Sequence, residues 1–470
     1  MRLEAIIGRV LISLDLSNKL DISARKIGFL IFYGPEIRTL LSSGLLDQVI
    51  ESGDKPVIFS RFEISDVGLA DIGAIETYIL PEGNPSYWRK FNGLFSSWLL
   101  KYLKAHQRYL GFGNFHWSNG YRGSTSKSDF WSALVRFPLI SIINLLNYFR
   151  WDLKSYSSII SNSQVDSIFY SSYQDSNLIE FLICARREKV NLVYILSNWK
   201  DIYINNHHQV IPNILSYWSE KLFLDSLRIN GLLSSSKFII SGNPTFYPFS
   251  NYTSLMSKED FFLNYGIAGD MKVILWAGSM QSLVSDECIL IDNLVHVIRD
   301  SGLNYRVILR VNPFSNYMFY RNYYQDISEV TVCENNWKRN VEKDITYQTE
   351  TGELEWSELL FHCDLLVSAP STVALEATMF NKSIINFIFD SSDCLNQKLL
   401  SILESPFYRA LVGNGYVNIA KNMSELISLL NRNANDLRSD EINSSIPDII
   451  SGNRIYNAEV FYTELKETLI

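Results

Sequence analysis

The chain has 470 residues, of which 47% are apolar and 20% are charged, a composition that is typical of globular proteins and excludes a disordered chain. Since domains usually hold about 100–200 residues, this length suits two or three domains, and we take two as the starting count. The net charge of −8 disfavours general nucleic-acid binding. Five scattered cysteines with no CxxC pair and six histidines with no HExxH spacing argue against a disulfide framework and a metal site. We therefore expect reduced thiols, as in a cytosol, and no bound metal.

The first twenty residues do not have the pattern of a signal peptide. Their apolar stretch contains Glu4, Arg9 and Asp15, whereas a signal peptide needs an uninterrupted apolar core. The most apolar run, at 137–149, has thirteen residues, and a membrane-spanning helix needs roughly 20. We expect a cytoplasmic protein that is soluble or bound peripherally to a membrane.

A basic and aromatic segment interrupts the first half of the chain at about 85–160. Ten Lys and Arg from Arg89 to Lys154 stand against two Asp, a surplus of eight positive charges. Aromatic residues lie among these cations, namely Trp88, Phe91, Trp98, Tyr102, Tyr109, Phe115, Trp117, Tyr121 and Trp131. This composition suits the anionic inner face of a membrane. The alternative is a solvated insertion whose aromatic side chains pack inward, and we expect the insertion to be helical.

Short apolar runs alternate with helical patterns through the first half, which is typical of βαβ units. A strand expected at 26–33 precedes a segment in which Ile37, Leu40 and Leu41 recur at helical spacing. Further strands are expected at 55–60, 165–172, 190–197 and 237–244, and helices at 177–189 and 211–227.

The alternation breaks at 241–254, where Gly, Pro, Asn and Ser cluster as in an interdomain linker. Nearly continuous Val, Ile and Leu runs on both sides of it predict parallel strands that are buried on both faces. We predict two Rossmann-like, doubly wound α/β domains that face a central cleft, at 1–245 and 246–452, followed by a helix at 453–470. The second domain is expected to have strands at 271–279, 304–313, 329–334, 363–370 and 382–389, and helices at about 286–300, 355–362 and 371–380.

Polar residues follow the strand expected at 363–370. Ser371 or Thr372 is placed to cap the next helix, and a helix N-terminus offers N–H groups and about half a positive charge to a diphosphate. Glu376 lies four residues after Thr372, on the same helix face and about 6 Å along the axis. That is a suitable separation between a diphosphate and the ribose hydroxyls of one nucleotide. The competing interpretation is an ordinary helix cap and a solvated glutamate.

The segment SAPSTVALEATMFNKSII (368–385) resembles the donor-binding turn of GT-B glycosyltransferases, in particular bacterial surface-polysaccharide transferases of the capsule, lipopolysaccharide and teichoic acid types. Asn381 and Ser383 stand where Gly and Pro are usual in that family. The run VILWAGSMQS (273–282) resembles the family's glycine-rich loop. LRVNP (309–313) resembles its Arg-x-His-Pro segment, with Asn312 in place of the His.

This resemblance implies the two-domain GT-B fold and metal-independent transfer of a sugar from a nucleotide-sugar donor, with no cofactor. It implies that the closing helix crosses back to the first domain. It also implies a set of donor-binding residues, which are Gly278, Ser279, Arg310, Ser371, Thr372 and Glu376.

An inverting transferase also needs a base that deprotonates the acceptor hydroxyl, normally from the N-terminal domain. The candidates at strand ends or adjoining turns are Glu36, Asp175 and Asp201. Glu36 has an alternative role in favourable contact with a helix dipole, and Asp175 as a helix N-cap. The basic segment suggests a glycan or lipid-linked acceptor near a membrane, in surface-polysaccharide biosynthesis.

Three other functions remain open on the same frame. A UDP-sugar 2-epimerase shares the architecture but needs carboxylates and histidines in the cleft. A CDP-polyol phosphotransferase would use a similar acceptor. A non-catalytic nucleotide- or glycan-binding protein is favoured by the missing Gly, His and Pro of the family motifs.

Overall fold

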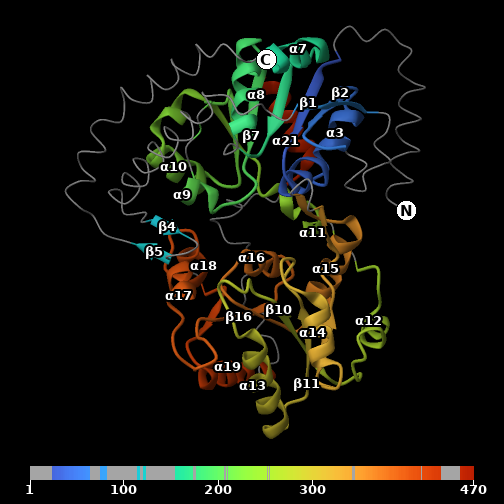
Figure 1. The fold of residues 1–470 in the computed structure, drawn as a ribbon, viewed down its shortest axis with the longest axis vertical. Helices are drawn as coiled ribbons and strands as arrows, with labels where there is room; N and C mark the ends of the chain where they lie inside the picture. The colour runs from blue at the N-terminus through green and yellow to red at the C-terminus, as the bar shows by residue number, and fades with distance from the viewer. Residues whose placement is uncertain are drawn as a thin grey trace, which may run out of the picture.

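The computed structural model describes residues 24–63, 75–81, 114–116, 120–122, 154–172, 176–205, 208, 210–250, 252, 254–340, 345–413, 415–435 and 456–469. In this part of the chain two lobes lie end to end, and each is built around a parallel sheet (Figure 1). The two doubly wound α/β domains expected from the sequence are confirmed.

The sheet of the N-terminal lobe has seven parallel strands in the order β3-β2-β1-β6-β7-β8-β9. The chain starts in the centre at β1, moves to one edge and then returns to build the other. Ligands of such sheets usually lie where this direction reverses, here between β1 and β6. The strands are β1 (Lys26–Ile31), β2 (Lys55–Ser60), β3 (Glu76–Ile79), β6 (Ser167–Tyr170), β7 (Asn191–Ile195), β8 (Ile214–Tyr217) and β9 (Lys237–Ile240).

The C-terminal lobe repeats this topology in a six-stranded parallel sheet with the order β12-β11-β10-β15-β16-β17. The direction reverses between β10 and β15, which are hydrogen-bonded neighbours. The strands are β10 (Lys272–Ala277), β11 (Tyr305–Arg310), β12 (Val330–Cys333), β15 (Leu365–Ser368), β16 (Ser383–Phe387) and β17 (Asn418–Ala420).

Helices connect the strands of both sheets. Those of the N-terminal lobe are α2 (Gly34–Glu36), the π-helix η1 (Ile37–Leu41), α3 (Leu45–Glu51), α7 (Lys154–Ser163), α8 (Ser176–Arg187), α9 (Asp201–Asn205), α10 (Glu220–Ile229) and the 3₁₀ turn η4 (Gly231–Ser235). The linker forms the 3₁₀ turn η5 (Pro244–Phe246) and α11 (Tyr247–Ser250). The rest of the chain contains α12 (Lys258–Asn264), α13 (Glu287–Asp300), α14 (Tyr317–Tyr324), α15 (Glu350–His362), α16 (Val373–Thr378), α17 (Gln397–Leu403), α18 (Arg409–Gly413), α19 (Met423–Asn435) and α21 (Ala458–Thr468).

The helix expected at 211–227 is wrong in its first half. Residues Ile214–Tyr217 form β8, a buried strand between β7 and β9, and α10 begins at Glu220. A short apolar run such as ILSY suits a buried strand and a buried helix equally, so its periodicity does not separate them. The true start of the helix is marked by Ser219, whose side chain accepts a hydrogen bond from the backbone N–H of Leu222.

Part of the expected basic insertion falls within the described residues. Asn114–His116 (β4) and Gly120–Arg122 (β5) form an antiparallel hairpin, so the expectation of a helical insertion is wrong for these strands. The hairpin contacts α9 of one lobe and α17 of the other, at the side of the junction between them (Figure 1). Most of the cations and aromatic residues that suggested a membrane surface lie outside the described residues. In the part of the chain that the structure describes, no helix has the length and apolar character to cross a bilayer.

The hydrophobic face of the N-terminal sheet is completed by residues from far along the chain. Helix α21 packs against α3 and β9 and contributes Phe461, Tyr462 and Leu465 to one buried cluster with β1. The antiparallel hairpin of β13 (Trp337–Asn340) and β14 (Ile345–Gln348) adds Tyr347 to the same cluster. The chain therefore passes between the lobes more than once.

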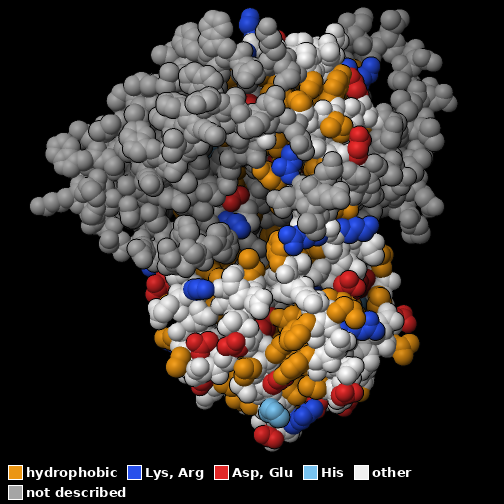
Figure 2. All heavy atoms as spheres, viewed as in Figure 1, with side chains coloured by type: hydrophobic (Ala, Val, Ile, Leu, Met, Phe, Trp, Pro, Cys, Tyr) orange, Lys and Arg blue, Asp and Glu red, His pale blue; other side chains and the backbone are white. Residues whose placement is uncertain are grey.

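The surface of the C-terminal lobe carries a group of exposed apolar side chains. Phe314 follows β11, and Met318 and Phe319 lie in α14. Hydrophobic side chains gather over this part of the lobe in Figure 2.

Asp54 anchors α21 to the N-terminal lobe. Its carboxylate accepts hydrogen bonds from the Tyr462 hydroxyl at 2.8 Å and the backbone N–H of Arg25 at 2.9 Å, and it pairs with Lys466 Nζ at 2.9 Å. Burial opposes the charge, but these donors outweigh it and lower the pKa of Asp54. The stabilisation is therefore complete above the ordinary carboxyl pKa of 3.8 and is lost as the pH falls through the folded-state value.

We predict that Asp54→Asn lowers the free energy of unfolding by about 1–3 kcal/mol at neutral pH, because a charged acceptor becomes a neutral amide. Urea unfolding followed by circular dichroism measures the change, with Glu459→Gln, which alters an exposed carboxylate of α21, as control. The difference from wild type should shrink once the pH is low enough to protonate Asp54. Equal stability of Asp54→Asn and wild type at neutral pH would contradict the anchor.

Candidate functional site

The carboxyl ends of β10 and β15 meet at the point where the C-terminal sheet reverses direction. Ala277 at the end of β10 is paired in register with Ser368 at the end of β15. The loop with Gly278 and Ser279 follows β10, and the turn with Ser371 follows β15. Thr372 lies in the same turn as Ser371. Four of the predicted donor-binding residues thus lie in two neighbouring loops at one edge of the sheet. This edge faces the N-terminal lobe, as the position of α16 shows (Figure 1).

Gly278 allows the ends of β10 and β11 to come close together. A Cβ atom at this position would lie 2.9 Å from both the carbonyl oxygen of Arg310 and the backbone nitrogen of Asn312. The Gly278 N–H donates to that Arg310 oxygen at 2.9 Å, and Asn312 Nδ2 donates to the Gly278 oxygen at 3.3 Å. A glycine is required here because any side chain would push these backbones apart.

The loop after Gly278 is hydrogen-bonded to a buried carboxyl group. Glu287 Oε1 accepts hydrogen bonds from the Ser279 backbone N–H at 2.7 Å and from the Trp276 indole at 3.1 Å. Burial raises the pKa of Glu287 to about 7, against the opposing effect of these donors. Ser279 itself is buried. The loop is therefore held in one conformation by a side chain that no motif indicated.

Ser371 and Thr372 are half-buried residues before α16. Thr372 makes no side-chain cap, because its backbone is already helical, with φ −64° and ψ −18°. Of the two residues offered as the helix cap, Ser371 and Thr372, the second is therefore not one. The Ser371 N–H donates to the Tyr408 hydroxyl at 3.3 Å, and that hydroxyl donates in turn to Asn386. The turn is thus anchored to β16 through Tyr408.

Glu376 is buried, with 9% of its surface exposed. It is therefore not the solvated glutamate of the competing interpretation. Its Oε2 accepts a hydrogen bond from the Trp356 indole at 2.7 Å. Its Oε1 lies 2.9 Å from Nη1 of Arg38, which belongs to η1 of the N-terminal lobe. The carboxylate is therefore shared between the lobes.

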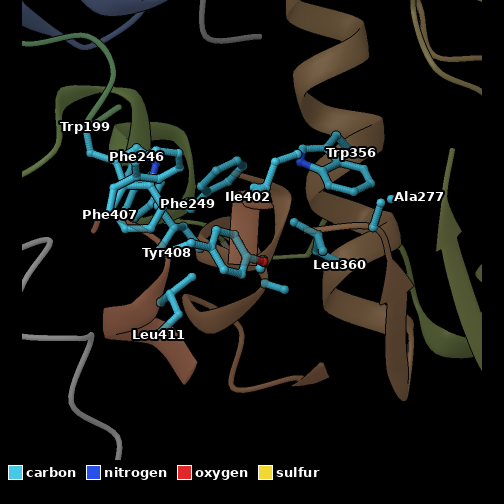
Figure 3. Close-up of a cluster of buried hydrophobic side chains, with 14 of the residues drawn as sticks. Trp199, Phe246, Phe249, Ala277, Trp356, Leu360, Ile402, Phe407, Tyr408 and Leu411 are labelled. Atoms are coloured by element: carbon cyan, nitrogen blue, oxygen red, sulfur yellow. The ribbon is translucent and has the colours of Figure 1, made fainter. Parts of the chain in front are cut away.

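Trp356 joins Glu376 to Arg310. The guanidinium carbon of Arg310 lies 4.2 Å from the centroid of the Trp356 ring, and Arg310 Nη2 donates to the Asn335 carbonyl at 3.4 Å. Burial lowers the pKa of Arg310 to about 10, so the side chain stays cationic at neutral pH. The structure thus brings Arg310 and Glu376 together through a residue that the sequence did not single out. Figure 3 shows this tryptophan on α15 beside Ala277.

Aromatic side chains close the seam between the lobes next to these residues. Trp199, which is fully buried and precedes α9, packs against Phe407 at 5.5 Å and Tyr408 at 6.2 Å between ring centroids. Figure 3 shows Phe246 and Phe249 of the linker in the same group. Tyr408 therefore contacts both the Ser371 turn and the N-terminal lobe.

The three base candidates lie in different environments. Glu36 is buried, and one of its carboxylate oxygens accepts the backbone N–H groups of Phe32 and Tyr33, so it serves the start of its own helix. Asp175 lies outside the described residues. Asp201 is partly buried at the start of α9, and burial raises its pKa to about 6 against the opposing charge of Lys200.

Sequence reasoning missed Arg38, Trp356 and Tyr408. Arg38 is a cation among apolar residues of its segment, which was a usable signal. Trp356 and Tyr408 lie in no motif, and nothing in their neighbourhood along the chain indicated a role. Among the described residues, no group of three or more His, Cys, Asp or Glu is placed to hold a metal ion; metal independence stays a prediction.

No protein-family model matches the sequence, and no curated protein is significantly similar to it. Several solved structures do resemble its fold. A glycosyltransferase from Rickettsia africae ESF-5 has 11% identity and a TM-score of 0.52, with 95% of this chain and 99% of that chain covered. The UDP-GlcNAc 2-epimerase from Neisseria meningitidis, solved with UDP-GlcNAc, has 12% identity and a TM-score of 0.54, with 94% and 99% covered. The UDP-GlcNAc 2-epimerase from Methanocaldococcus jannaschii has 12% identity and a TM-score of 0.52, also with 94% and 99% covered.

These likenesses agree with the two sheets of equal topology and with the carboxyl edge that faces the other lobe. At such low identity they establish the architecture and leave the reaction open. The chain has the two-domain GT-B fold.

Proposed function

We propose that this chain is a metal-independent GT-B glycosyltransferase that binds a nucleotide sugar on its C-terminal lobe. The observation that carries the proposal is the array of Arg310, Trp356 and Glu376 at the carboxyl edge of the sheet. The array lies beside the two loops at the switch point, which is the place between β10 and β15 where the sheet reverses direction. Open α/β sheets bind their ligands at this position. The neighbour from Neisseria meningitidis was solved with UDP-GlcNAc, which supports a nucleotide sugar as ligand.

The chemistry of these residues suits the departure of a nucleoside diphosphate. Arg310 supplies a cation that remains charged at neutral pH, and Ser371 and Thr372 supply hydroxyl groups beside the start of α16. Glu376 would accept the ribose hydroxyls. Stabilisation of the negative charge that develops on the leaving group would be the main catalytic effect.

For the base we favour Asp201 among the three candidates. It lies between Trp199 and Tyr203, which both pack on Phe407 of the C-terminal lobe, so its segment borders the site. A carboxyl with a pKa near 6 is a better proton acceptor at neutral pH than an ordinary one. The acceptor would be a glycan or lipid-linked glycan of surface-polysaccharide biosynthesis, at the inner face of a membrane.

A UDP-sugar 2-epimerase is the second candidate, because two of the three similar structures described above are epimerases. Epimerisation needs acid and base groups on the sugar and no acceptor. The array supplies one cation and one carboxylate, so the two reactions are best separated by the products that form without an acceptor.

We predict that the protein binds UDP or GDP more tightly than CMP or CDP, and hydrolyses the matching nucleotide sugar slowly when no acceptor is present. Calorimetric titration with the four nucleotides, followed by product analysis with a UDP-sugar alone, separates the candidates. An epimer or a glycal among the products would replace transferase with epimerase. Binding without turnover would indicate a non-catalytic protein, and a preference for CDP a polyol phosphotransferase.

We predict that Trp356→Phe weakens nucleoside diphosphate binding about tenfold, or roughly 1.4 kcal/mol. Phenylalanine keeps a ring beneath Arg310 but removes the N–H that orients Glu376. The loss should therefore be larger for UDP than for its 2′,3′-dideoxy analogue, which has no ribose hydroxyls. Thermal unfolding checks that the variant is folded. An equal loss for both ligands would show that Trp356 does not act through Glu376.

We predict that Asp201→Asn lowers kcat/KM for transfer by about 10²–10⁴-fold while the binding of UDP stays unchanged. In the wild type, kcat/KM should rise about tenfold per pH unit below 6 and level off above it, because only the deprotonated carboxyl accepts a proton. The rising limb should vanish in the variant. A limb that persists in Asp201→Asn would assign the base to another residue.

A further inference from the structure

The carboxylate of Glu376 is engaged from both lobes at once. Trp356 of α15 donates to Oε2, and Arg38 of η1 lies 2.9 Å from Oε1. The Glu376 side chain is 12% exposed and that of Arg38 is 19% exposed. Little of the carboxylate is therefore open to a further partner.

Arg38 is held in this position by more than one contact. Its Nε lies 3.6 Å from Glu353 Oε1, and its guanidinium carbon lies 5.4 Å from the centroid of the Phe249 ring. Burial opposes its charge, but the two glutamates raise the pKa of Arg38, so it remains a cation. The contact is thus a built ion pair between lobes and not a chance encounter of surface side chains.

The contacts with Trp356 and Arg38 leave no free oxygen edge on Glu376 for the ribose hydroxyls of a nucleotide. Two vicinal ribose hydroxyls can both donate to one carboxylate only if an oxygen edge of that carboxylate faces the ligand. Here one oxygen is taken by the indole of the same lobe and the other by the guanidinium of the opposite lobe. The indole is fixed in the core of the C-terminal lobe, where Trp356 is 1% exposed. Arg38 is therefore the group that has to leave.

We propose that Arg38 and the ribose of the donor nucleotide compete for the carboxylate of Glu376, so that donor binding releases an ion pair that holds the two lobes together. This inference rests on the proposed function. On this proposal Arg38 takes, at Oε1 of Glu376, the place that the ribose would occupy. The segment that carries Arg38 is itself tightly packed, because a Cβ on Gly34, four residues before Arg38, would overlap the carbonyl oxygen of Thr346.

The test compares the affinities of wild type and Arg38→Gln for two ligands. The probe is whichever of UDP, CDP and GDP binds wild type most tightly, together with its 2′,3′-dideoxy analogue. Arg38→Gln should bind the nucleotide at least about fivefold more tightly than wild type does, and the dideoxy analogue with unchanged affinity. Glu353→Gln, which loosens Arg38 without touching Glu376, should give a smaller gain in the same direction.

The matched control is Arg321→Gln, which removes an exposed arginine of α14 and should change neither affinity. If Arg38→Gln proves unstable, Arg38→Lys keeps the charge, loses the planar fork of the guanidinium and should still tighten nucleotide binding. An affinity that stays equal or falls in both Arg38 variants, while Glu376→Gln weakens nucleotide binding, overturns the competition and leaves the proposed function standing. If none of the three nucleotides binds, or Glu376→Gln affects neither ligand, the proposed donor site itself fails.

Discussion

The buried carboxylate of Glu376 is the point on which the seam between the lobes and the candidate site both depend. A charge taken out of water is very unfavourable unless cations and hydrogen-bond donors surround it. Arg38 and Trp356 meet this requirement from opposite lobes. Trp356 in turn carries Arg310 on its ring. One carboxylate thus takes part in the contact between the lobes and is linked through Trp356 to Arg310 at the carboxyl edge of the sheet.

The architecture was readable from the sequence because parallel strands that are buried on both faces need continuous apolar runs. KIGFLI and KVILWA show this clearly. Strand β3 was not predicted, because it lies at the sheet edge and its sequence ETYI is largely exposed. Strand β8 was mistaken for a helix since four buried residues are too few to establish a period.

The site was readable only in part, for a related reason. Gly278 and Ser371 follow strands and Arg310 is the last residue of one, so the topology alone places them at one edge of the sheet. The partner of Glu376 could not be found in the same way. Arg38 is 338 positions away in the chain, and the side chains that meet across a seam are set by how two lobes dock. The sequence around Glu376 does not indicate how the lobes dock. For this reason helix geometry alone predicted an open carboxylate, whereas in the structure Arg38 and Trp356 cover it.

The crossing of α21 to the N-terminal lobe bears on how the protein is made. The hydrophobic face of β1 is covered in part by Phe461, Tyr462 and Leu465, so it stays incomplete until the ribosome has synthesised residue 465. Domains generally fold in order from the N-terminus during translation, but here the C-terminal sheet has all its strands before the first lobe has its last helix. The nascent first lobe therefore exposes this part of its apolar surface throughout the synthesis of the second.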